Sequence, residues 1–284
     1  MRRAMRPLGP FHLAVLVCAM LSRASHVRGA VILGDIWLLG DSITSGYTVK
    51  GAYRSQLYTS LTAAGATFKF VGSSNADSTT SLTNAGQQFH DGHSGWTIAN
   101  APGRSGLYEA VQGWYPTISE PEYILLMIGT NDINLDIDRA NAPSRLNLLI
   151  TRLVQLDPTA TLIVSSIPAA SNSNAYKTAS VTDLPAAIQA YNAAIPGVVA
   201  QHQALGQHVV FFDMYSKLSL SDLGSDGLHP TQAGYNKIGS AFAAALVPEP
   251  GTAFVLGAGV LVLARRRRKC MPERSLVSRA TIIA

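Results

Sequence analysis

The sequence is poor in cysteine, and its two cysteines both lie near the ends of the chain. Cys18 falls in the N-terminal segment and Cys270 follows the arginine cluster near the C-terminus. Val17 precedes Cys18, whereas a lipoprotein signal needs a small residue at that place, so lipidation is not expected. The central stretch 31–247 therefore offers neither a disulfide nor a thiol for chemistry.

The central stretch also lacks an excess of positive charge, although the whole chain carries a formal net charge of +5. Residues 31–247 hold 10 Lys and Arg against 15 Asp and Glu, which gives a net charge of about −5 with histidine neutral. The other 12 basic residues lie in the two ends. Because nucleic-acid-binding domains need clustered basic residues, we expect no nucleic-acid partner.

The N-terminal end has the pattern of an export signal. Residues 1–30 contain an arginine-rich start, an apolar run over 11–21, and small residues near Ala24 and Ala30. A positive start, a short apolar stretch and a small-residue cleavage site are typical of a secretory signal peptide. We therefore expect a signal peptide at 1–30, with a buried first helix as the alternative.

The C-terminal end has three parts in a fixed order: Val247-Pro248-Glu249-Pro250, an apolar stretch over 252–264, and a basic run over 265–269. The stretch of 13 residues is short of the roughly 20 that span a bilayer comfortably. The arginines behind it would hold its end on the cytoplasmic side. The order resembles the PEP-CTERM sorting signal of exported bacterial proteins, which an exosortase-type membrane protease removes.

This resemblance implies a sorting segment at 248–269, followed by a basic tail of unknown role at 270–284. It also implies an exported protein that resides in the cell envelope or extracellular matrix, or is secreted after C-terminal processing. Contact with a membrane is then expected only through the terminal segments. A plain stop-transfer anchor is the alternative.

Between the ends, apolar runs of strand length alternate with helical patterns. The runs predict strands at 36–39, 67–72, 123–128, 161–164 and 208–212. Helical spacing predicts helices over 53–64, 146–153, 184–195 and 235–246, with Pro196 kinking or ending the third. Polar loops are expected at 73–95 and 169–182. The alternation favours one α/β domain over 31–247, with a doubly wound, five-stranded parallel sheet between helical layers.

Four polar islands lie just past apolar runs or in loops. They are Gly40-Asp41-Ser42, Gly92-His93-Ser94-Gly95-Trp96, Gly129-Thr130-Asn131-Asp132 and Asp226-Gly227-Leu228-His229-Pro230. Each alone is common in turns, but in this order they resemble the motifs of the SGNH (GDSL-type) hydrolase family, whose fold is three-layered and flavodoxin-like. The resemblance covers residues 36–247. It implies a catalytic triad of Ser42, Asp226 and His229, and an oxyanion hole of Ser42, Gly95 and Asn131.

The residue types at these positions suit acyl transfer. A serine hydroxyl is a poor nucleophile until a base takes its proton, and His229 can do so and later protonate the leaving alcohol. Asp226, three residues earlier, can fix the imidazole tautomer. Each oxyanion donor is worth on the order of 3 kcal/mol of barrier. The sequence has no Gly-x-Ser-x-Gly elbow, which disfavours an ordinary α/β-hydrolase.

His90 and His93, with Asp91 between them, have a spacing compatible with a zinc site, but the sequence places no further strong ligand nearby. We expect these side chains to shape the loop that carries Gly95, and we expect no metal or other cofactor. Trp96 could pack this loop down or offer a face to a sugar ring. Core positions are expected for Tyr191, Tyr235 and Phe211.

The exact residues of the four islands, together with Tyr53-Arg54 and Phe70-Val71-Gly72-Ser73, resemble those of the acetylxylan-esterase branch, carbohydrate esterase family 3. That resemblance implies an exported serine esterase acting on an acetylated polysaccharide through an acyl-enzyme. Two alternatives stay open. One is a lysophospholipase or short-chain lipase-like esterase, and the other is a non-catalytic glycan-binding surface protein on a hydrolase fold.

Overall fold

The computed structural model describes residues 31–247. The predicted signal peptide, sorting segment and basic tail lie outside the described residues, and so does the predicted contact with a membrane. Within 31–247, no helix combines the length and the apolar character needed to cross a bilayer.

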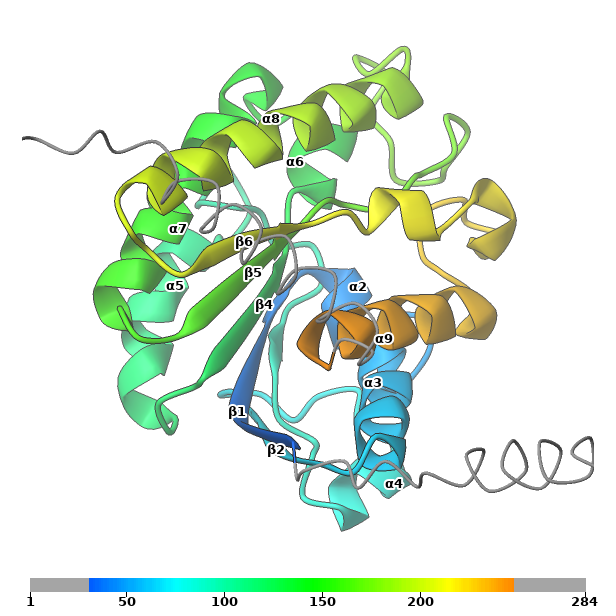
Figure 1. Cartoon of the computed structure of the whole chain (residues 1–284). Helices are drawn as coiled ribbons and strands as arrows, with labels where there is room; N and C mark the ends of the chain where they lie inside the picture. The colour runs from blue at the N-terminus through cyan, green and yellow to red at the C-terminus, as the bar shows by residue number, and fades with distance from the viewer. Residues whose placement is uncertain (1–30, 248–284) are drawn as a thin grey trace, which may run out of the picture.

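The described chain alternates strands with helices, as Figure 1 shows. The strands are β1 (Val31–Gly40), β2 (Ala66–Val71), β3 (Asp91–Gly92), β4 (Tyr123–Met127), β5 (Thr161–Ser165) and β6 (Val209–Phe212). The helices are α2 (Ser42–Ser45), α3 (Ala52–Ala63), α4 (Thr80–Asn84), α5 (Leu107–Trp114), α6 (Thr130–Asn134), α7 (Ala142–Leu156), α8 (Leu184–Ala204) and α9 (Gln232–Leu246). Short 3-10 turns occupy Tyr115–Thr117, Arg139–Asn141, Tyr215–Lys217 and Leu220–Asp222.

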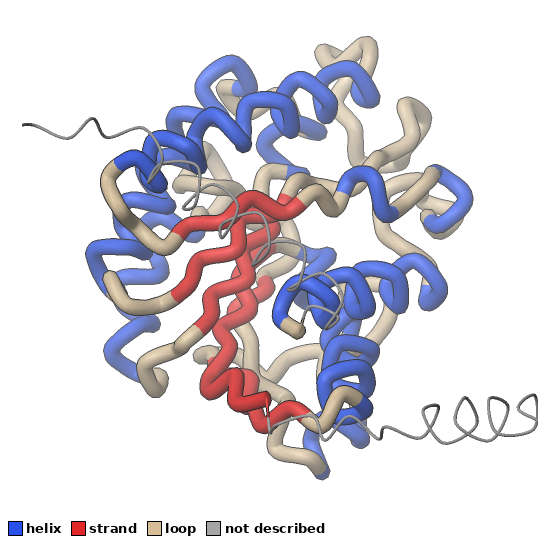
Figure 2. Tube along the Cα trace, in the orientation of Figure 1, coloured by secondary structure: helices blue, strands red, loops and turns tan. Residues whose placement is uncertain are grey.

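The sheet confirms the predicted parallel α/β architecture. Its main strands follow the order β2-β1-β4-β5-β6, and each neighbouring pair is parallel. The chain moves outward from β1 to β2 and then crosses to β4 on the other side of β1. Ligands of open α/β sheets bind at such a switch point, outside the carboxyl ends of the strands. The strands of the sheet lie side by side in Figure 2.

Side chains that point alternately to the two faces of the sheet build the three layers. Trp37 and Leu39 point into one apolar cluster with residues of α5, α7 and α8, whereas Ile36 and Leu38 point into the other, with residues of α3 and α9. Successive side chains of a strand face opposite sides of a sheet, so both faces of β1 are covered. Burying each of these side chains contributes roughly 1.5–3 kcal/mol. The two sets of helices flank the sheet in Figure 1.

Some local predictions were wrong. The stretch 73–95, predicted as a loop, contains α4 and the two-residue strand β3, which pairs with the end of β1 and makes the sheet six-stranded. Pro196 was expected to kink or end its helix, and the second of these does not occur: α8 continues to Ala204, because the flanking Ile195 and Val199 are buried in the core. Helix α5 was missed. The loop at 169–182 is confirmed.

The predicted core aromatics behave differently from one another. Tyr191 and Tyr235 are buried, as expected. Phe211 on β6 is only partly buried, because β6 is an edge strand of the sheet.

Candidate active site

Ser42 lies at the carboxyl end of β1, where the strand gives way to a single turn of helix. Asp41 caps that turn, since its Oδ1 accepts a hydrogen bond from the Ile43 N–H at 2.9 Å. Ser42 is the first residue of α2, so its own N–H precedes the helical hydrogen-bond ladder. Within 31–247 no group accepts from that N–H. The serine thus presents a hydroxyl and an unused donor at the same point.

His229 connects Ser42 to Asp226. The His229 Nε2 lies 2.9 Å from the Ser42 Oγ, and the His229 Nδ1 lies 2.7 Å from the Asp226 Oδ2. An ionised carboxylate only accepts hydrogen bonds, so Nδ1 carries the proton and Nε2 is left to accept from the serine hydroxyl. This is the geometry that a Ser–His–Asp triad requires.

Asp226 is held by the turn on which it sits. Its Oδ1 accepts from the N–H groups of Leu228 and His229, both at 3.0 Å. Burial raises the pKa of the Asp226 carboxyl, but these two bonds and the His229 ring together lower that pKa below its ordinary value. Asp226 is therefore an anion at neutral pH, with its second oxygen aimed at the imidazole.

The short strand β3 brings Gly95 next to Ser42. Strand β3 pairs with Leu39 and Gly40 of β1, and the His93 N–H donates to the Gly40 carbonyl at 3.0 Å. Gly95 follows with φ +80°, a left-handed conformation that favours glycine. No described group accepts from its N–H. The unpredicted strand is thus what carries this donor to the end of β1.

Asn131 enters from the neighbouring strand β4, which ends just before α6. One of its amide hydrogens is donated to the Trp96 carbonyl at 2.8 Å. Ser42, Gly95, Asn131 and His229 all line one cavity of about 300 Å³. The structure therefore brings together all five residues that the sequence singled out, four of them on this cavity and Asp226 behind His229.

Asp132, the next residue, supports the site, although no role was predicted for it. It is fully buried, and its Oδ2 accepts from the Ile98 N–H at 3.0 Å. Its Oδ1 pairs with the Arg145 guanidinium at 2.9 Å. Burial raises the pKa of the Asp132 carboxyl, and Arg145 opposes that shift. The only indication in the sequence that Asp132 supports the site was its position directly after Asn131.

No structural role was predicted for Arg54 either, although Tyr53-Arg54 is one of the segments that resemble carbohydrate esterase family 3. Its guanidinium is fully buried and donates to the carbonyls of Ser45 at 2.9 Å, Asp77 at 3.1 Å and Gln88 at 3.2 Å. Burial lowers the pKa of Arg54 to about 10. The side chain ties the end of α2 to the stretch that leads into β3.

His90, Asp91 and His93 have structural partners within the same stretch. The Gly92 N–H donates to the His90 Nδ1 at 3.0 Å, so the opposite ring nitrogen carries the proton and donates to the Ala76 carbonyl. Burial lowers the pKa of His90 to about 3, which keeps the ring neutral. Asp91 accepts from the Trp37 indole at 2.7 Å. No three potential metal ligands cluster anywhere in the described chain.

Trp96 packs the loop down. Its ring stacks on His93, with centroids 4.5 Å apart, and His93 stacks in turn on Trp114 at 4.7 Å. The indole is not among the residues that line the Ser42 cavity. The loop-packing interpretation of Trp96 therefore fits the structure.

Two tyrosines present aromatic rings to the Ser42 cavity. Tyr47 and Tyr176 line the cavity and are 54% and 41% exposed. Their ring centroids lie 4.9 and 5.5 Å from the His229 ring. Sequence periodicity does not find them, because both lie in irregular segments outside any amphipathic pattern.

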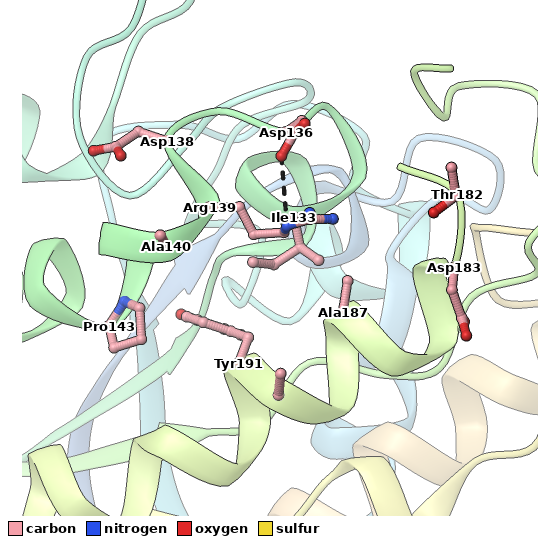
Figure 3. Close-up of a pocket in the computed structure, with 11 residues that line it drawn as sticks. Ile133, Asp136, Asp138, Arg139, Ala140, Pro143, Thr182, Asp183, Ala187 and Tyr191 are labelled. Carbon is pink, nitrogen blue, oxygen red and sulfur yellow. Dashed lines mark ion pairs between the residues drawn. The ribbon is translucent and has the colours of Figure 1, made fainter. Parts of the chain in front are cut away.

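A larger cavity of about 710 Å³ lies against another face of α6, where Ile133 lines it together with Tyr191 and Ala187 of α8 (Figure 3). Its rim carries Asp136 and Arg139, which pair at 3.4 Å. Neither Ser42 nor His229 contributes to this cavity. Because Ser42 and His229 line the smaller cavity and not this one, the smaller cavity is the candidate active site.

The three-layer α/β fold, and the arrangement of Ser42, His229 and Asp226 at the carboxyl end of its sheet, are those of a hydrolase of the α/β class. The chain belongs to the GDSL-like lipase/acylhydrolase family, a family of carboxylic ester hydrolases, whose model matches residues 38–237. Residues 246–269 match the PEP-CTERM protein-sorting motif, which indicates an exported protein that is processed at its C-terminus. Both predicted resemblances are confirmed.

Relatives include carbohydrate esterases. The chain is 33% identical over 241 residues to a multidomain esterase of Ruminococcus flavefaciens. The matched region covers 80% of this chain but only 30% of that protein. A family 3 carbohydrate esterase of Clostridium thermocellum has 32% identity and a TM-score of 0.60, covering 75% of this chain and 94% of that one. An acetyl esterase has 26% identity and a TM-score of 0.58, covering 75% and 96%. The chain thus spans under a third of the multidomain relative.

Proposed function

We propose that the protein is an exported serine esterase that removes acetyl groups from a polysaccharide through an acyl-enzyme intermediate. The observation that carries the proposal is the chain of contacts from Asp226 through His229 to Ser42, at 2.7 and 2.9 Å. Ser42, at one end of this chain of contacts, faces a cavity that is also lined by Gly95 and Asn131, the two other proposed oxyanion donors.

In the first half-reaction the Ser42 Oγ attacks the acetyl carbonyl carbon while the His229 Nε2 takes the hydroxyl proton. The carbonyl oxygen becomes an anion, which the N–H groups of Ser42 and Gly95 and the Asn131 amide stabilise. The Asp226 carboxylate stabilises the imidazolium. When the intermediate collapses, the bond to the sugar oxygen breaks and His229 protonates the departing alcohol.

In the second half-reaction a water molecule attacks the acetyl group on Ser42, and His229 takes the water proton. The same three donors hold the new oxyanion. Collapse breaks the bond between the acetyl carbon and the Ser42 Oγ, His229 returns a proton to that oxygen, and acetate leaves. No step requires a metal or cofactor.

Three observations support a small acyl group on a sugar. The cavity of about 300 Å³ is at the lower end of the range for ligand sites, which favours a short acyl chain. Tyr47 and Tyr176 present flat apolar faces with polar tips on its wall, which suit the faces of a sugar ring. Two similar solved proteins are a family 3 carbohydrate esterase and an acetyl esterase.

The sorting motif supports a location outside the cytoplasm. We infer processing by an exosortase-type protease, after which the domain resides in the envelope or matrix or is released. Pulse-labelling of the full chain should show a precursor that shortens at its C-terminus only in cells with such a protease. A precursor that shortens equally without the protease contradicts this inference.

The test of the activity is acetate release from p-nitrophenyl acetate and from acetylated xylan, with Ser42→Ala beside the wild type. Wild-type protein should cleave both and form a Ser42 adduct heavier by one acetyl group in quenched mass spectra, and Ser42→Ala should do neither. Retained activity in Ser42→Ala contradicts the mechanism. Cleavage of lysophospholipid without acetylated glycan favours the lipase-like alternative, and inertness with glycan binding favours the non-catalytic one.

A further inference from the structure

Arg104 carries the one permanent charge among the side chains that line the Ser42 cavity. Its neighbours on the wall are neutral residues such as Ser94, Leu135 and Tyr176, apart from the titratable His229. The surrounding domain has a net charge of about −5, so this cation stands out against its background.

A tight turn presents Arg104 at this place. Ala101 and Arg104 exchange reciprocal backbone hydrogen bonds of 3.1 and 2.9 Å. Between them lie Pro102 and Gly103, the latter with φ +71°, which is the residue pattern of a type II turn. The backbone of Arg104 is therefore fixed, and its exposed side chain reaches from the turn to the cavity.

The guanidinium is largely unused by the described chain. One nitrogen donates to the Gly95 carbonyl at 3.0 Å. No carboxylate within 31–247 forms an ion pair with it. A guanidinium has five N–H groups in a planar fork that matches a carboxylate, and one carbonyl leaves most of them available to a ligand.

We infer that Arg104 binds a carboxylate of the substrate, so that the preferred substrate is an acetyl ester on an acidic, uronate-containing polysaccharide. The inference rests on the proposed function. Since Arg104 contacts the carbonyl of Gly95, whose N–H is a proposed oxyanion donor, the carboxylate lies close to the reacting ester. We assign it to the sugar that carries the ester or to the adjacent sugar. Attraction must be local, because the domain as a whole repels a polyanion.

The test compares two substrates that differ at the uronate carboxyl group: acetylated oligogalacturonates with free, charged carboxylates, and the same oligomers with these groups converted to neutral methyl esters. Acetate release is measured for the wild type, Arg104→Gln and Arg104→Lys. Lys69→Gln on β2 is the matched control, because it removes one exposed positive charge far from the cavity.

We expect the wild type and Lys69→Gln to prefer the free acid by roughly tenfold in kcat/KM, which is about 1.4 kcal/mol. Arg104→Gln keeps a donor for the Gly95 carbonyl but loses the charge, so kcat/KM should fall more on the free acid than on the methyl ester, and the preference should drop to about one. Arg104→Lys should keep part of the preference, because it keeps the charge without the fork.

Two results overturn the inference. One is a wild type that cleaves both oligomers equally well. The other is an Arg104→Gln variant that loses activity equally on both, which would make Arg104 a positioning residue for Gly95. A wild type that prefers a monosuccinyl ester of a neutral xylooligosaccharide over the acetylated uronate places the anion on the acyl side instead and overturns the assignment to the sugar. A wild type without activity on p-nitrophenyl acetate contradicts the proposed function itself.

Discussion

The side-chain amide of Asn131 donates a hydrogen bond to the backbone carbonyl of Trp96 at 2.8 Å. This bond fixes α6 to the segment that carries Gly95, one residue earlier. Asp132 strengthens the connection by accepting from the Ile98 N–H at 3.0 Å. Two consecutive residues of α6 thus hold Trp96 and Ile98, both of which lie just after Gly95 in the chain. The proposed donors are oriented before a substrate binds, which is the condition for strong stabilisation of an oxyanion.

Replacing Asn131 by Ala should lower kcat on p-nitrophenyl acetate by roughly 10²- to 10³-fold, because one oriented donor is lost from the transition state. KM should change little, since the donor acts on charge that develops during attack. Asn147→Ala on α7 is the control, because Asn147 bonds His202 away from the cavity. Equal losses in both variants would mean that Asn131 acts only through the fold.

Replacing Asp226 by Asn should lower kcat by about 10⁴-fold, with the fold retained. The Asn oxygen can still accept from the Leu228 and His229 N–H groups, but its amide would donate toward the His229 Nδ1. The imidazole would then carry its proton on Nε2 and could not accept one from Ser42. Steady-state kinetics measures the loss of kcat, and a circular-dichroism melt checks that the fold is retained. A loss of less than tenfold contradicts the proposed tautomer.

The sequence predicted the parallel sheet well, because its strands are buried on both faces and their apolar runs are continuous. Ser42, Asn131 and His229 were identifiable because each follows such a run or lies in a motif with ordered spacing. Strand β3 was not predictable, since Asp91 and Gly92 are polar or small and the strand exists only through its pairing with β1. Tertiary contact, not local propensity, makes that element.

The supporting residues were harder to predict for a related reason. The role of Arg54 depends on carbonyls up to 34 positions away in the chain, and no local pattern encodes such contacts. Arg104 and Tyr176 lie on turns whose placement over the cavity follows from the folded connections. The continuation of α8 past Pro196 likewise reflects burial of its apolar residues, which outweighs the single lost hydrogen bond.

Asp41 should make the stability of the protein depend on pH in an unusual direction. Burial raises the pKa of its carboxyl from 3.8 to about 6, although the Ile43 N–H opposes the shift. The folded state therefore binds more protons than the unfolded state between those values, and the contribution of Asp41 to stability is lost as pH rises through about 6. Asp41→Asn removes this loss and keeps a capping oxygen.

We expect Asp41→Asn to be more stable than the wild type at neutral pH by up to about 3 kcal/mol in urea unfolding, with the gap closing near pH 4. Asp183→Asn, an exposed cap on α8, is the control. The same variant should lower kcat, because the attraction between Asp41 and charged His229 is lost. A stability gap that stays constant from about pH 4 to neutral contradicts the raised pKa.

Gly129 should tolerate no side chain, because it sets the angle at which α6 leaves β4. Its φ is +122°, and an added Cβ would lie 2.6 Å from the ring of Tyr191. That ring is buried, and its hydroxyl donates to the Ile128 carbonyl at 2.9 Å, so moving the ring away from a new Cβ would break this bond. Gly129→Ala should therefore destabilise the fold by about 2–4 kcal/mol.

The change at Gly129 should also lower kcat, because a shift of α6 carries Asn131 away from Trp96. Gly197→Ala is the matched control: Gly197 is exposed within α8 and an added Cβ there meets no atom within 4 Å. Its replacement should raise stability by about 0.5–1 kcal/mol through helix propensity and leave kcat unchanged. Urea unfolding and kinetics on p-nitrophenyl acetate measure both effects. If Gly129→Ala folds and turns over like Gly197→Ala, the turn before α6 does not position the proposed oxyanion donor.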